Sequence, residues 1–212
     1  MNIQDILFLI LIILFLFLIF QIIIRILAKI YPSPIPRQLL GILDIPVRDF
    51  ILSREELLKR SGLKSGQNVL EAGCGTGFYT IKASEIVKEG IVNSLDIQDL
   101  ALAKVRKKVE ENNVKNVMLI MADAQNLPFK DEAFDIAFLV TVIGEIPKRE
   151  IALKELHRVL KSNGLLSITE FLADPHYVMR RNLISLAERF GFNPAEKYGN
   201  FFCYTINFKK EI

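Results

Sequence analysis

The first thirty residues contain a run that few folds can accommodate. From Ile6 to Ile24, nineteen consecutive residues include one polar side chain, Gln21. A helix of that length spans roughly 28 Å, about the thickness of the hydrocarbon core of a bilayer. Because each Leu, Ile or Phe favours insertion, the run prefers the membrane by several kcal/mol in spite of Gln21. The sequence therefore predicts a transmembrane anchor over residues 1–30, with residues 6–24 in contact with lipid.

A cleaved signal peptide is the alternative interpretation of this run. It would need a basic start, a shorter apolar stretch and small residues at a cleavage site. The chain begins instead with Asn2, Gln4 and Asp5, and Ala28 is the only small residue between the start of the run and Tyr31. We therefore expect the anchor to be retained.

The flanks of the anchor predict its orientation. Arg25, Lys29 and Arg37 follow the span and no Lys or Arg precedes it, so the positive-inside tendency places the rest of the chain in the cytoplasm. We expect a single-pass protein of the cell membrane with a cytoplasmic domain, residues 38–212. Three prolines make residues 31–37 a stiff linker that would hold this domain close to the membrane. Residues 38–52 could lie along the membrane surface or cap the domain.

Outside the anchor the chain has the composition of an ordinary soluble domain. Hydrophobic residues make up roughly 46% of the remaining positions, near the usual value for globular proteins. The net charge of +3 is too small to indicate a nucleic-acid partner. Two cysteines far apart and two histidines do not form a zinc or disulfide framework, so we expect no metal.

Apolar runs and turn residues divide the rest of the chain into alternating helices and strands. Ser53 and Glu56 form a capping-box pattern at the start of a short helix that ends before Gly62. Repeated strand–helix units predict an α/β fold with a mostly parallel, doubly wound sheet. Further helices are expected over 78–87, 100–111, 148–160 and 178–190, and strands over 69–72, 91–95, 117–121, 134–142, 165–170 and 201–208.

The first strand runs directly into the sequence GCGTG at residues 73–77. Gly73, Gly75 and Gly77 permit positive φ and let the backbone approach a ligand with no Cβ in the way. In an open α/β sheet, ligands bind beyond the carboxyl ends of the strands, near the reversal in strand order. The pattern GxGxG alone is weak, because it also occurs in ordinary turns, and Phe78 departs from the GxGxxG of dinucleotide binders.

Three acidic residues lie at the ends of three successive predicted strands. Glu71 comes just before the glycines, Asp96 ends the second strand and Asp123 follows the third. Asp96 has the spacing at which a carboxylate can hold ribose hydroxyls. Converging carboxylates suit a ligand that is net cationic and carries a ribose. That description fits S-adenosylmethionine and suits NAD poorly.

These residues make the chain resemble the class I S-adenosylmethionine-dependent methyltransferase family, in particular its small-molecule branch that includes quinone and sterol methyltransferases. The resemblance covers about residues 63–208 and implies a Rossmann-like, doubly wound, mostly parallel seven-stranded sheet, preceded here by a single transmembrane helix. Its turn SNG at 162–164 departs slightly from the usual PGG. The segments that carry it are VLEAGCGTG at 69–77, LDI around Asp96, MADAQNLPFKDEAFD at 121–135 and HRVLKSNGLLSITE at 157–170.

The resemblance also implies how S-adenosylmethionine would be held. The residues concerned are Glu71, Gly73 and Gly75, with Gly77 in the same loop, at the methionine end, Asp96 at the ribose hydroxyls, Ile97, Asp123 and Ala124 at the adenine, and Val140 to Val142 at the outer face of the cofactor.

Methyl transfer requires orientation, a dry site and removal of the acceptor's proton, without a metal. Glu145 follows the fourth predicted strand, and His176 and Tyr177 follow the fifth, so these three are the candidate catalytic residues. Glu145 could equally begin the next helix, and His176 could cap a turn. Three other residues are expected to be structural, namely Cys74, Phe129 and His157.

We expect a membrane lipid as acceptor, either an isoprenoid quinone precursor or a phospholipid amine, because the anchor confines the domain to the plane where such a substrate is concentrated. One alternative is a soluble metabolite or protein acceptor, with the anchor serving only for location. Another is a non-catalytic, membrane-tethered domain that binds S-adenosylmethionine. A nicotinamide-dependent oxidoreductase is disfavoured, because none of the five tyrosines has Lys four residues later.

Overall fold

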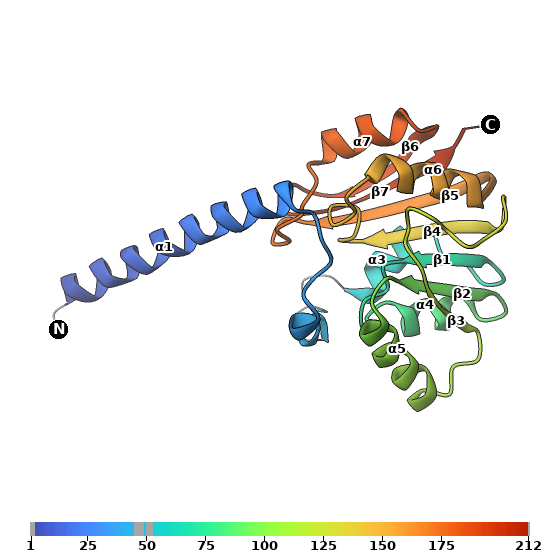
Figure 1. Ribbon diagram of the computed structural model, residues 1–212, viewed down its shortest axis with the longest axis horizontal. Coiled ribbons are helices and arrows are strands. Elements are labelled where there is room, and N and C mark those ends of the chain that lie inside the picture. Colours follow the sequence, from blue (N-terminus) through green and yellow to red (C-terminus); the bar gives the residue numbers. More distant parts are fainter. Residues whose placement is uncertain (1–2, 45–48, 50–52, 212) are drawn as a thin grey trace.

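The computed structural model describes residues 3–44, 49 and 53–211, so the predicted segment 38–52 lies only partly within the described residues. A long helix, α1 (Ile3–Ile30), projects from an α/β body (Figure 1). The other helices are η1 (Arg37–Asp44), α3 (Arg54–Arg60), α4 (Thr80–Val87), α5 (Asp99–Glu111), α6 (Arg149–Val159) and α7 (Arg180–Glu188). The strands are β1 (Asn68–Ala72), β2 (Ile91–Asp96), β3 (Val117–Met121), β4 (Phe134–Val140), β5 (Leu160–Phe171), β6 (Phe192–Gly199) and β7 (Cys203–Lys210).

The described strands form one seven-stranded sheet in the order β3-β2-β1-β4-β5-β7-β6. Strands β1 to β5 pair in parallel, whereas β7 is antiparallel to both β5 and β6. The chain fills one half of the sheet with β1 to β3 and then places β4 on the other side of β1, so the strand order reverses there. The predicted fold class is confirmed. Such a reversal opens a crevice at the carboxyl ends of the strands.

Helices cover both faces of the sheet. Leu70 and Leu139 pack on one face with side chains of α6 and α7. Their neighbours along the strands, Val69 and Phe138, pack on the other face with α3 and α4. Because strands buried on both faces carry apolar side chains on both, β4 is apolar from Ile136 to Val140, and β1 is apolar at Val69, Leu70 and Ala72.

Three elements differ most from the sequence-based expectation. Strand β5 begins at Leu160 and not at residue 165, so the expected turn at 162–164 lies within the strand, with Asn163 at a positive φ of 65°. Strand β4 ends at Val140, two residues early, because Thr141 adopts a positive φ of 55°. Strand β6 is not apparent in the sequence, since it contains Pro194 and a run of polar residues. Its position at the edge of the sheet explains both features, because an edge strand tolerates a residue without an N–H and leaves side chains in water.

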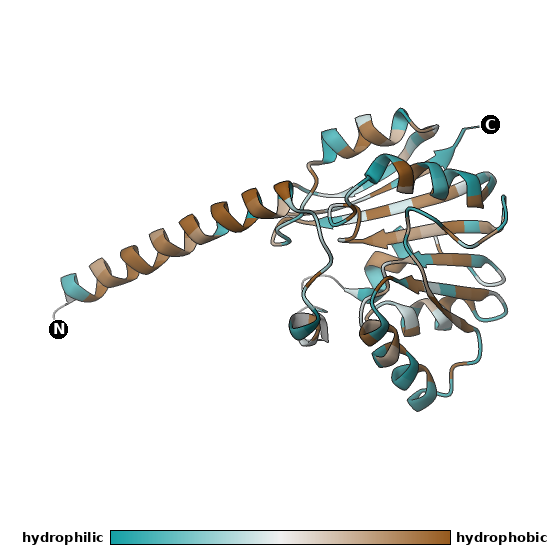
Figure 2. Ribbon diagram, viewed as in Figure 1, coloured by the Kyte–Doolittle hydropathy of each residue, from teal (hydrophilic) through white to brown (hydrophobic). Residues whose placement is uncertain are grey.

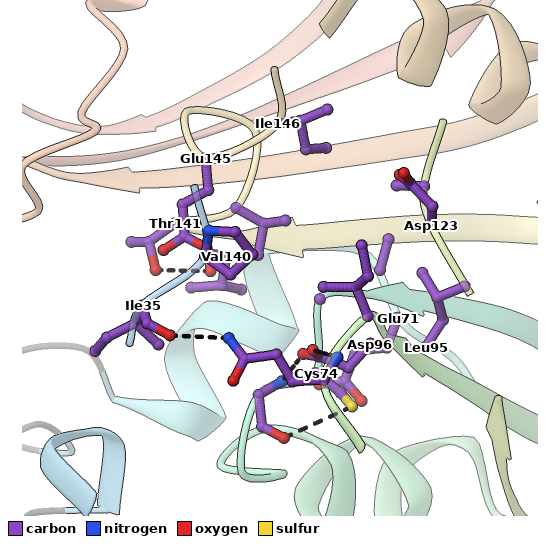
Figure 3. A pocket seen from close by; sticks show the side chains of 18 of the residues that line it. Ile35, Glu71, Cys74, Leu95, Asp96, Asp123, Val140, Thr141, Glu145 and Ile146 are labelled. Atoms are coloured by element: carbon purple, nitrogen blue, oxygen red, sulfur yellow. Dashed lines mark hydrogen bonds between the residues drawn. The ribbon is translucent and has the colours of Figure 1, made fainter. Parts of the chain in front are cut away.

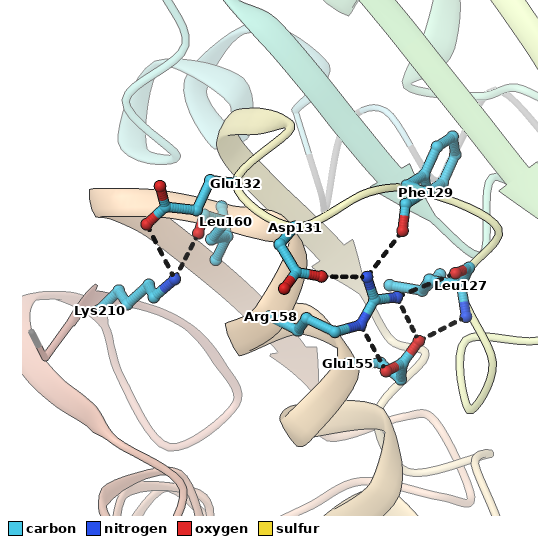
Figure 4. A network of polar contacts seen from close by, with 8 residues as sticks. All are labelled: Leu127, Phe129, Asp131, Glu132, Glu155, Arg158, Leu160 and Lys210. Carbon is cyan, nitrogen blue, oxygen red and sulfur yellow. Dashed lines mark hydrogen bonds and ion pairs between the residues drawn. The ribbon is translucent and has the colours of Figure 1, made fainter.

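A network of polar contacts fixes the long segment between β3 and β4 (Figure 4). The Arg158 guanidinium of α6 donates to both oxygens of Glu155, at 2.9 and 2.7 Å, and to the carbonyls of Leu127 and Phe129, at 3.0 and 2.7 Å. It also pairs with Asp131 at 2.8 Å. The guanidinium lowers the pKa of Glu155, mainly through these hydrogen bonds. Arg158 thus holds the segment that carries Asp123 toward the crevice.

Helix α1 is apolar along almost its whole length (Figure 2). Among the described residues, Gln4–Ile30 is the one helical stretch long and apolar enough to cross a membrane, and its most apolar 18 residues have a mean hydropathy of 3.4. Near its C-terminal end, Arg25 donates to the backbone carbonyls of Leu172 and, at 3.2 Å, Asp174 in the loop after β5. Helix α1 is therefore connected to the carboxyl edge of the sheet by specific hydrogen bonds.

Candidate functional site

A cavity of about 270 Å³ lies at the carboxyl ends of β1, β2 and β4, where the strand order reverses. Figure 3 shows Glu71, Asp96, Asp123, Val140, Thr141 and Glu145 among its lining residues. Its other lining residues include Gly73, Gly75, Ile97, Gln98, Ala124 and Asp174, and Pro34, Ile35 and Leu40 from the linker and η1. We call this space the strand-end cavity.

The glycine loop is held against β2 by its own backbone. The N–H groups of Gly73 and Cys74 donate to the carbonyl of Leu95 at 2.8 and 2.9 Å. Gly73 has φ of +77°, and a Cβ there would lie 2.5 Å from a methyl carbon of Val142. Both constraints require glycine at residue 73, which puts bare backbone at the cavity wall.

Asp96 closes the base of this loop. One carboxylate oxygen accepts from the Gly75 N–H at 2.8 Å and the other from the Gln98 N–H at 2.9 Å. Burial raises the pKa of Asp96, and these backbone hydrogen bonds oppose that rise. A carboxylate has about four acceptor positions, so it can still bind two vicinal hydroxyls of a ligand.

Glu71 is a buried carboxyl in the cavity lining, and it is only 3% exposed. One of its oxygens accepts from the hydroxyls of Thr80, at 2.6 Å, and Ser94, at 2.7 Å. Burial raises the pKa of Glu71 to about 7, despite these hydrogen bonds. A cationic ligand group nearby would favour the ionised carboxylate. The cavity can therefore supply the counter-ion for a positively charged ligand group.

The proline linker forms part of the cavity wall. The Gln98 amide nitrogen donates to the carbonyl of Ile35 at 2.8 Å, which places Pro34 and Ile35 along the lining. Gln98 is buried, and its Oε1 has no hydrogen-bond partner among the described residues. A buried acceptor without a donor is costly. A ligand hydroxyl or amine in the cavity would supply that donor.

Asp123 and its neighbours form the other end of the lining. The Asp123 carboxylate accepts from the backbone N–H and the side-chain amide of Gln125, at distances from 2.8 to 3.1 Å. Ala124 is buried, whereas Ile97 is 51% exposed and lines the cavity with an apolar side chain. An exposed isoleucine beside a cavity can pack on the flat face of a ligand ring.

Thr141 and Glu145 lie on the β4 side of the cavity. A positive φ is a genuine outlier for a β-branched residue, and such strain is concentrated at ligand sites. The Thr141 N–H donates to the carbonyl of Thr169 at 2.8 Å, and its hydroxyl donates to the carbonyl of Val140 at 2.7 Å. The strained turn brings Glu145 into the lining (Figure 3).

Three of the predicted site residues lie outside the cavity lining. Gly77, with φ of +79°, packs against Val105 of α5. The Tyr177 hydroxyl donates to the carbonyl of Phe201 at 2.8 Å, in the turn between β6 and β7. His176 lies two residues from the lining residue Asp174, whose carboxylate accepts from the His176 backbone N–H at 2.7 Å.

The residues expected to be structural occupy ordinary packing positions. Cys74 is buried between the glycines, and burial raises the pKa of its thiol, so it stays protonated at neutral pH. Phe129 packs edge-on against Phe134, with ring centroids 4.8 Å apart, and His157 packs in the same way on Phe192 at 5.3 Å. Within the described part of the chain, no group of three or more His, Cys, Asp or Glu could hold a metal ion.

Sequence reasoning did not find several residues of this site. The linker residues Pro34 and Ile35 have the composition of a spacer, and no local pattern shows which surface they cover. Gln98 and Asp174 lie two and three residues after a strand, where a polar side chain is common. Proximity to Asp96 along the chain was the one available signal for Gln98, because residues just past a strand end share its edge of the sheet.

Comparison with known proteins agrees with this geometry. Residues 63–190 match a family model described as a methyltransferase domain. A demethylmenaquinone methyltransferase of Listeria welshimeri is 38% identical over 115 residues, which cover 54% of this chain and 49% of the relative. A ubiquinone/menaquinone biosynthesis C-methyltransferase, UbiE, of a Shewanella species is 35% identical over 130 residues, covering 60% of this chain and 52% of that protein. The chain thus matches about half the length of these curated relatives.

Solved structures share the fold. A SAM-dependent methyltransferase from Aquifex aeolicus superposes with a TM-score of 0.79 at 24% identity, covering 84% of this chain and 100% of the other. The [4+2]-cyclase SpnF superposes with a TM-score of 0.67 at 17% identity, covering 75% of this chain and 80% of that one. Since a cyclase shares the architecture, structural likeness at this identity establishes the fold and leaves the reaction to the residues of the site.

Proposed function

The chain belongs to the methyltransferase domain family, and from that premise we propose that it transfers a methyl group from S-adenosylmethionine to a lipophilic acceptor held in the membrane. The observation that carries the proposal is the strand-end cavity. Buried carboxylates, the Gln98 amide oxygen without a hydrogen-bond partner and the exposed glycine backbone all line this cavity, where the strand order reverses.

The cavity residues fit each part of the methyl donor. S-adenosylmethionine supplies a methyl group activated by a positively charged sulfur. Glu71 and the Gly73–Gly75 backbone would hold its methionine end, where the carboxylate balances positive charge. Asp96 and the amide oxygen of Gln98 would accept from the ribose hydroxyls. Ile97, Asp123 and Ala124 would contact the adenine, with Val140 at the outer face.

Glu145 is the lining residue best placed to act on the methyl acceptor. It follows the strained turn at Thr141, on the opposite side of the cavity from the glycine loop. Its carboxylate would orient the acceptor and receive the proton that the acceptor loses as its new bond to carbon forms. Asp174 lines the same side, and His176 and Tyr177 contribute to the loop that carries it.

The nature of the acceptor is inferred from the relatives and from α1. Relatives that bear quinone-methyltransferase names make an isoprenoid quinone precursor the favoured acceptor, with a phospholipid amine as the second lipid. Helix α1 would anchor the chain in the cell membrane as a single span. The basic residues Arg25 and Lys29, which follow the apolar run, favour a cytoplasmic body.

The test is methyl transfer by the full chain in native membranes. With isotopically labelled S-adenosylmethionine, label should enter the extracted lipid fraction, and mass spectrometry should find one methyl group in place of a hydrogen. Deleting residues 1–30 should lower turnover on membrane lipid far more than it weakens cofactor binding. Label confined to soluble metabolites or proteins would contradict the lipid acceptor, and cofactor binding without any transfer would identify a non-catalytic binding domain.

A further inference from the structure

The turn between β6 and β7, residues 199–203, exposes two adjacent aromatic side chains. Phe201 is 58% exposed and Phe202 is 65% exposed, and their rings meet edge to face with centroids 5.9 Å apart. Exposing two adjacent aromatic side chains to water is unfavourable, and such exposed apolar patches mark contact surfaces. In Figure 1 this turn lies at the same end of the body as the base of α1.

Hydrogen bonds hold the backbone of this turn in one conformation, and that conformation keeps the two aromatic side chains exposed. The Asn200 side-chain oxygen accepts from the backbone N–H groups of Phe202, at 2.8 Å, and Cys203, at 3.3 Å. The Arg180 guanidinium donates to the carbonyls of Gly199 and Asn200 at 3.1 and 3.2 Å. Little ordering would therefore be needed when the turn meets a partner.

Hydrogen bonds connect this turn to α1 through Leu172, a residue of the loop after β5. The Leu172 N–H donates to the carbonyl of Phe202 at 2.7 Å, and the Leu172 carbonyl accepts from the Arg25 guanidinium. A single residue, Leu172, thus links the backbone of the aromatic pair to a side chain of α1. Tyr177 ties the same turn to the loop after β5 through the carbonyl of Phe201.

These contacts set the depth of the turn relative to a bilayer. If residues 6–24 cross the hydrocarbon, Arg25 lies at its boundary, where a cation meets lipid headgroups. The turn, which is linked to Arg25 through Leu172, would then lie close to that boundary. Phenylalanine is among the apolar side chains that interfacial segments bury at the boundary between headgroups and acyl chains.

We propose that the β6–β7 turn is a second membrane contact, with Phe201 and Phe202 inserted among the headgroups beside α1. The inference rests on the proposed function insofar as α1 must span the bilayer. Two contacts on one face prevent the body from rotating about α1. They hold the carboxyl edge of the sheet, and with it the strand-end cavity, toward the lipid.

The chain has no tryptophan, so single Trp substitutions provide unique probes of depth. Phe202→Trp reports on the turn, Phe15→Trp on the middle of α1, and Ile91→Trp on an exposed position at the opposite edge of the sheet. Each full-length variant is reconstituted into vesicles of phosphatidylcholine with a minor share of phosphatidylglycerol. The vesicles carry lipids brominated either near the headgroup or near the bilayer centre.

We expect Phe202→Trp to emit at shorter wavelength than Ile91→Trp and to be quenched by bromine near the headgroup. Phe15→Trp should be quenched by bromine at the centre, and Ile91→Trp by neither. Quenching of Phe202→Trp no greater than that of Ile91→Trp, with Phe15→Trp quenched, would overturn the second contact and leave the anchor intact. If Phe15→Trp also escaped quenching, the anchor in the proposed function would fail together with this inference.

Discussion

The two sides of the strand-end cavity are built in different ways. On the donor side, Glu71, Gly73 and Asp96 lie on or directly after central strands, and hydrogen bonds from nearby residues hold them in place. On the proposed acceptor side, Glu145 and Asp174 lie on the loops after β4 and β5. The donor side is thus positioned mainly by the sheet, whereas the acceptor side is positioned by loops, one of which is hydrogen-bonded to Arg25 of α1.

This difference suggests a division of labour. A rigid donor side can bind one cofactor in one pose, because the sheet fixes the cofactor-binding side chains before the cofactor arrives. An acceptor side made of loops can adjust to a substrate that arrives from elsewhere. Because Arg25 of α1 is hydrogen-bonded to the loop after β5, membrane attachment would affect the acceptor more than the cofactor. Four predictions test that division, and a fifth tests the buried carboxyl groups.

The largest effect is expected from filling the donor side. Gly73→Ala places a methyl group 2.5 Å from Val142 and forces a positive φ on alanine. Because both the backbone and a lining side chain must shift, S-adenosylmethionine should bind about 100-fold more weakly, equivalent to about 3 kcal/mol, as measured by calorimetry.

Gly66→Ala is the matched control for Gly73→Ala. Gly66 also has a positive φ, +82°, but a Cβ there meets nothing within 4 Å. The control should lower stability by about 1–2 kcal/mol through backbone strain alone and leave the cofactor Kd unchanged. Equal loss of cofactor binding in both variants would show that Gly73 acts only through folding.

A crossed pair of substitutions separates the two sides of the cavity. Glu145→Gln keeps the shape of the side chain and removes its charge, so kcat should fall at least about tenfold, as for loss of a general base, with cofactor Kd unchanged. Asp96→Asn should instead raise the cofactor Kd about tenfold, as for loss of charged hydrogen bonds. Steady-state kinetics and calorimetry on both variants give the comparison. If Glu145→Gln weakened cofactor binding as much as Asp96→Asn, the division of the cavity would be wrong.

The pH dependence of cofactor binding tests the buried carboxyl of the donor side. Burial raises the pKa of Glu71 to about 7, so below that pH the carboxyl is neutral in the empty cavity. A cationic ligand favours the ionised form. Binding at pH 6 should therefore release a proton, and the affinity should rise about tenfold in total between pH 6 and 8. Calorimetry in buffers of different ionisation enthalpy measures that proton, and Glu71→Gln should abolish the dependence.

The same pKa shifts affect stability without ligand. Burial raises the pKa of Glu71 to about 7 and that of Glu170 to about 8. In the folded state both groups hold their protons at pH values where the unfolded chain has lost them. Stability is therefore greatest in mild acid and declines as pH rises through 7 and 8. A melting temperature that rose over this range would contradict the assignment.

The smallest effect is expected from releasing the linker. Gln98→Leu removes the 2.8 Å hydrogen bond to the Ile35 carbonyl and keeps most of the side-chain volume. Loss of one hydrogen bond and of the proposed contact to a ribose hydroxyl should weaken cofactor binding about two- to tenfold, chiefly by faster dissociation in stopped-flow experiments. An unchanged dissociation rate would mean that the linker wall is irrelevant to the donor. Asp99→Asn, at an exposed ion pair with Arg37 nearby, is the control and should have almost no effect.

Much of the donor side could be predicted from the sequence because its determinants are local. The strand–glycine–helix pattern located the loop, and the acids at 71, 96 and 123 followed from strand ends alone, all three of which line the cavity. Of the three candidate catalytic residues, Glu145 lines the cavity, whereas His176 and Tyr177 do not. Position after a strand indicates the correct edge of the sheet, but not the direction of a side chain within a loop.

The sequence by itself determined most of the elements, the positions of the acids at the strand ends and the apolar length of α1, since each depends on neighbours along the chain. The tertiary structure alone decided that residues 34 and 35 wall the cavity, that Arg25 holds the loop after β5, and that β6 completes the sheet. These features join residues far apart in the chain through backbone carbonyls. Every residue has a backbone carbonyl, so no pattern of side chains in the sequence predicts which carbonyl accepts the hydrogen bond.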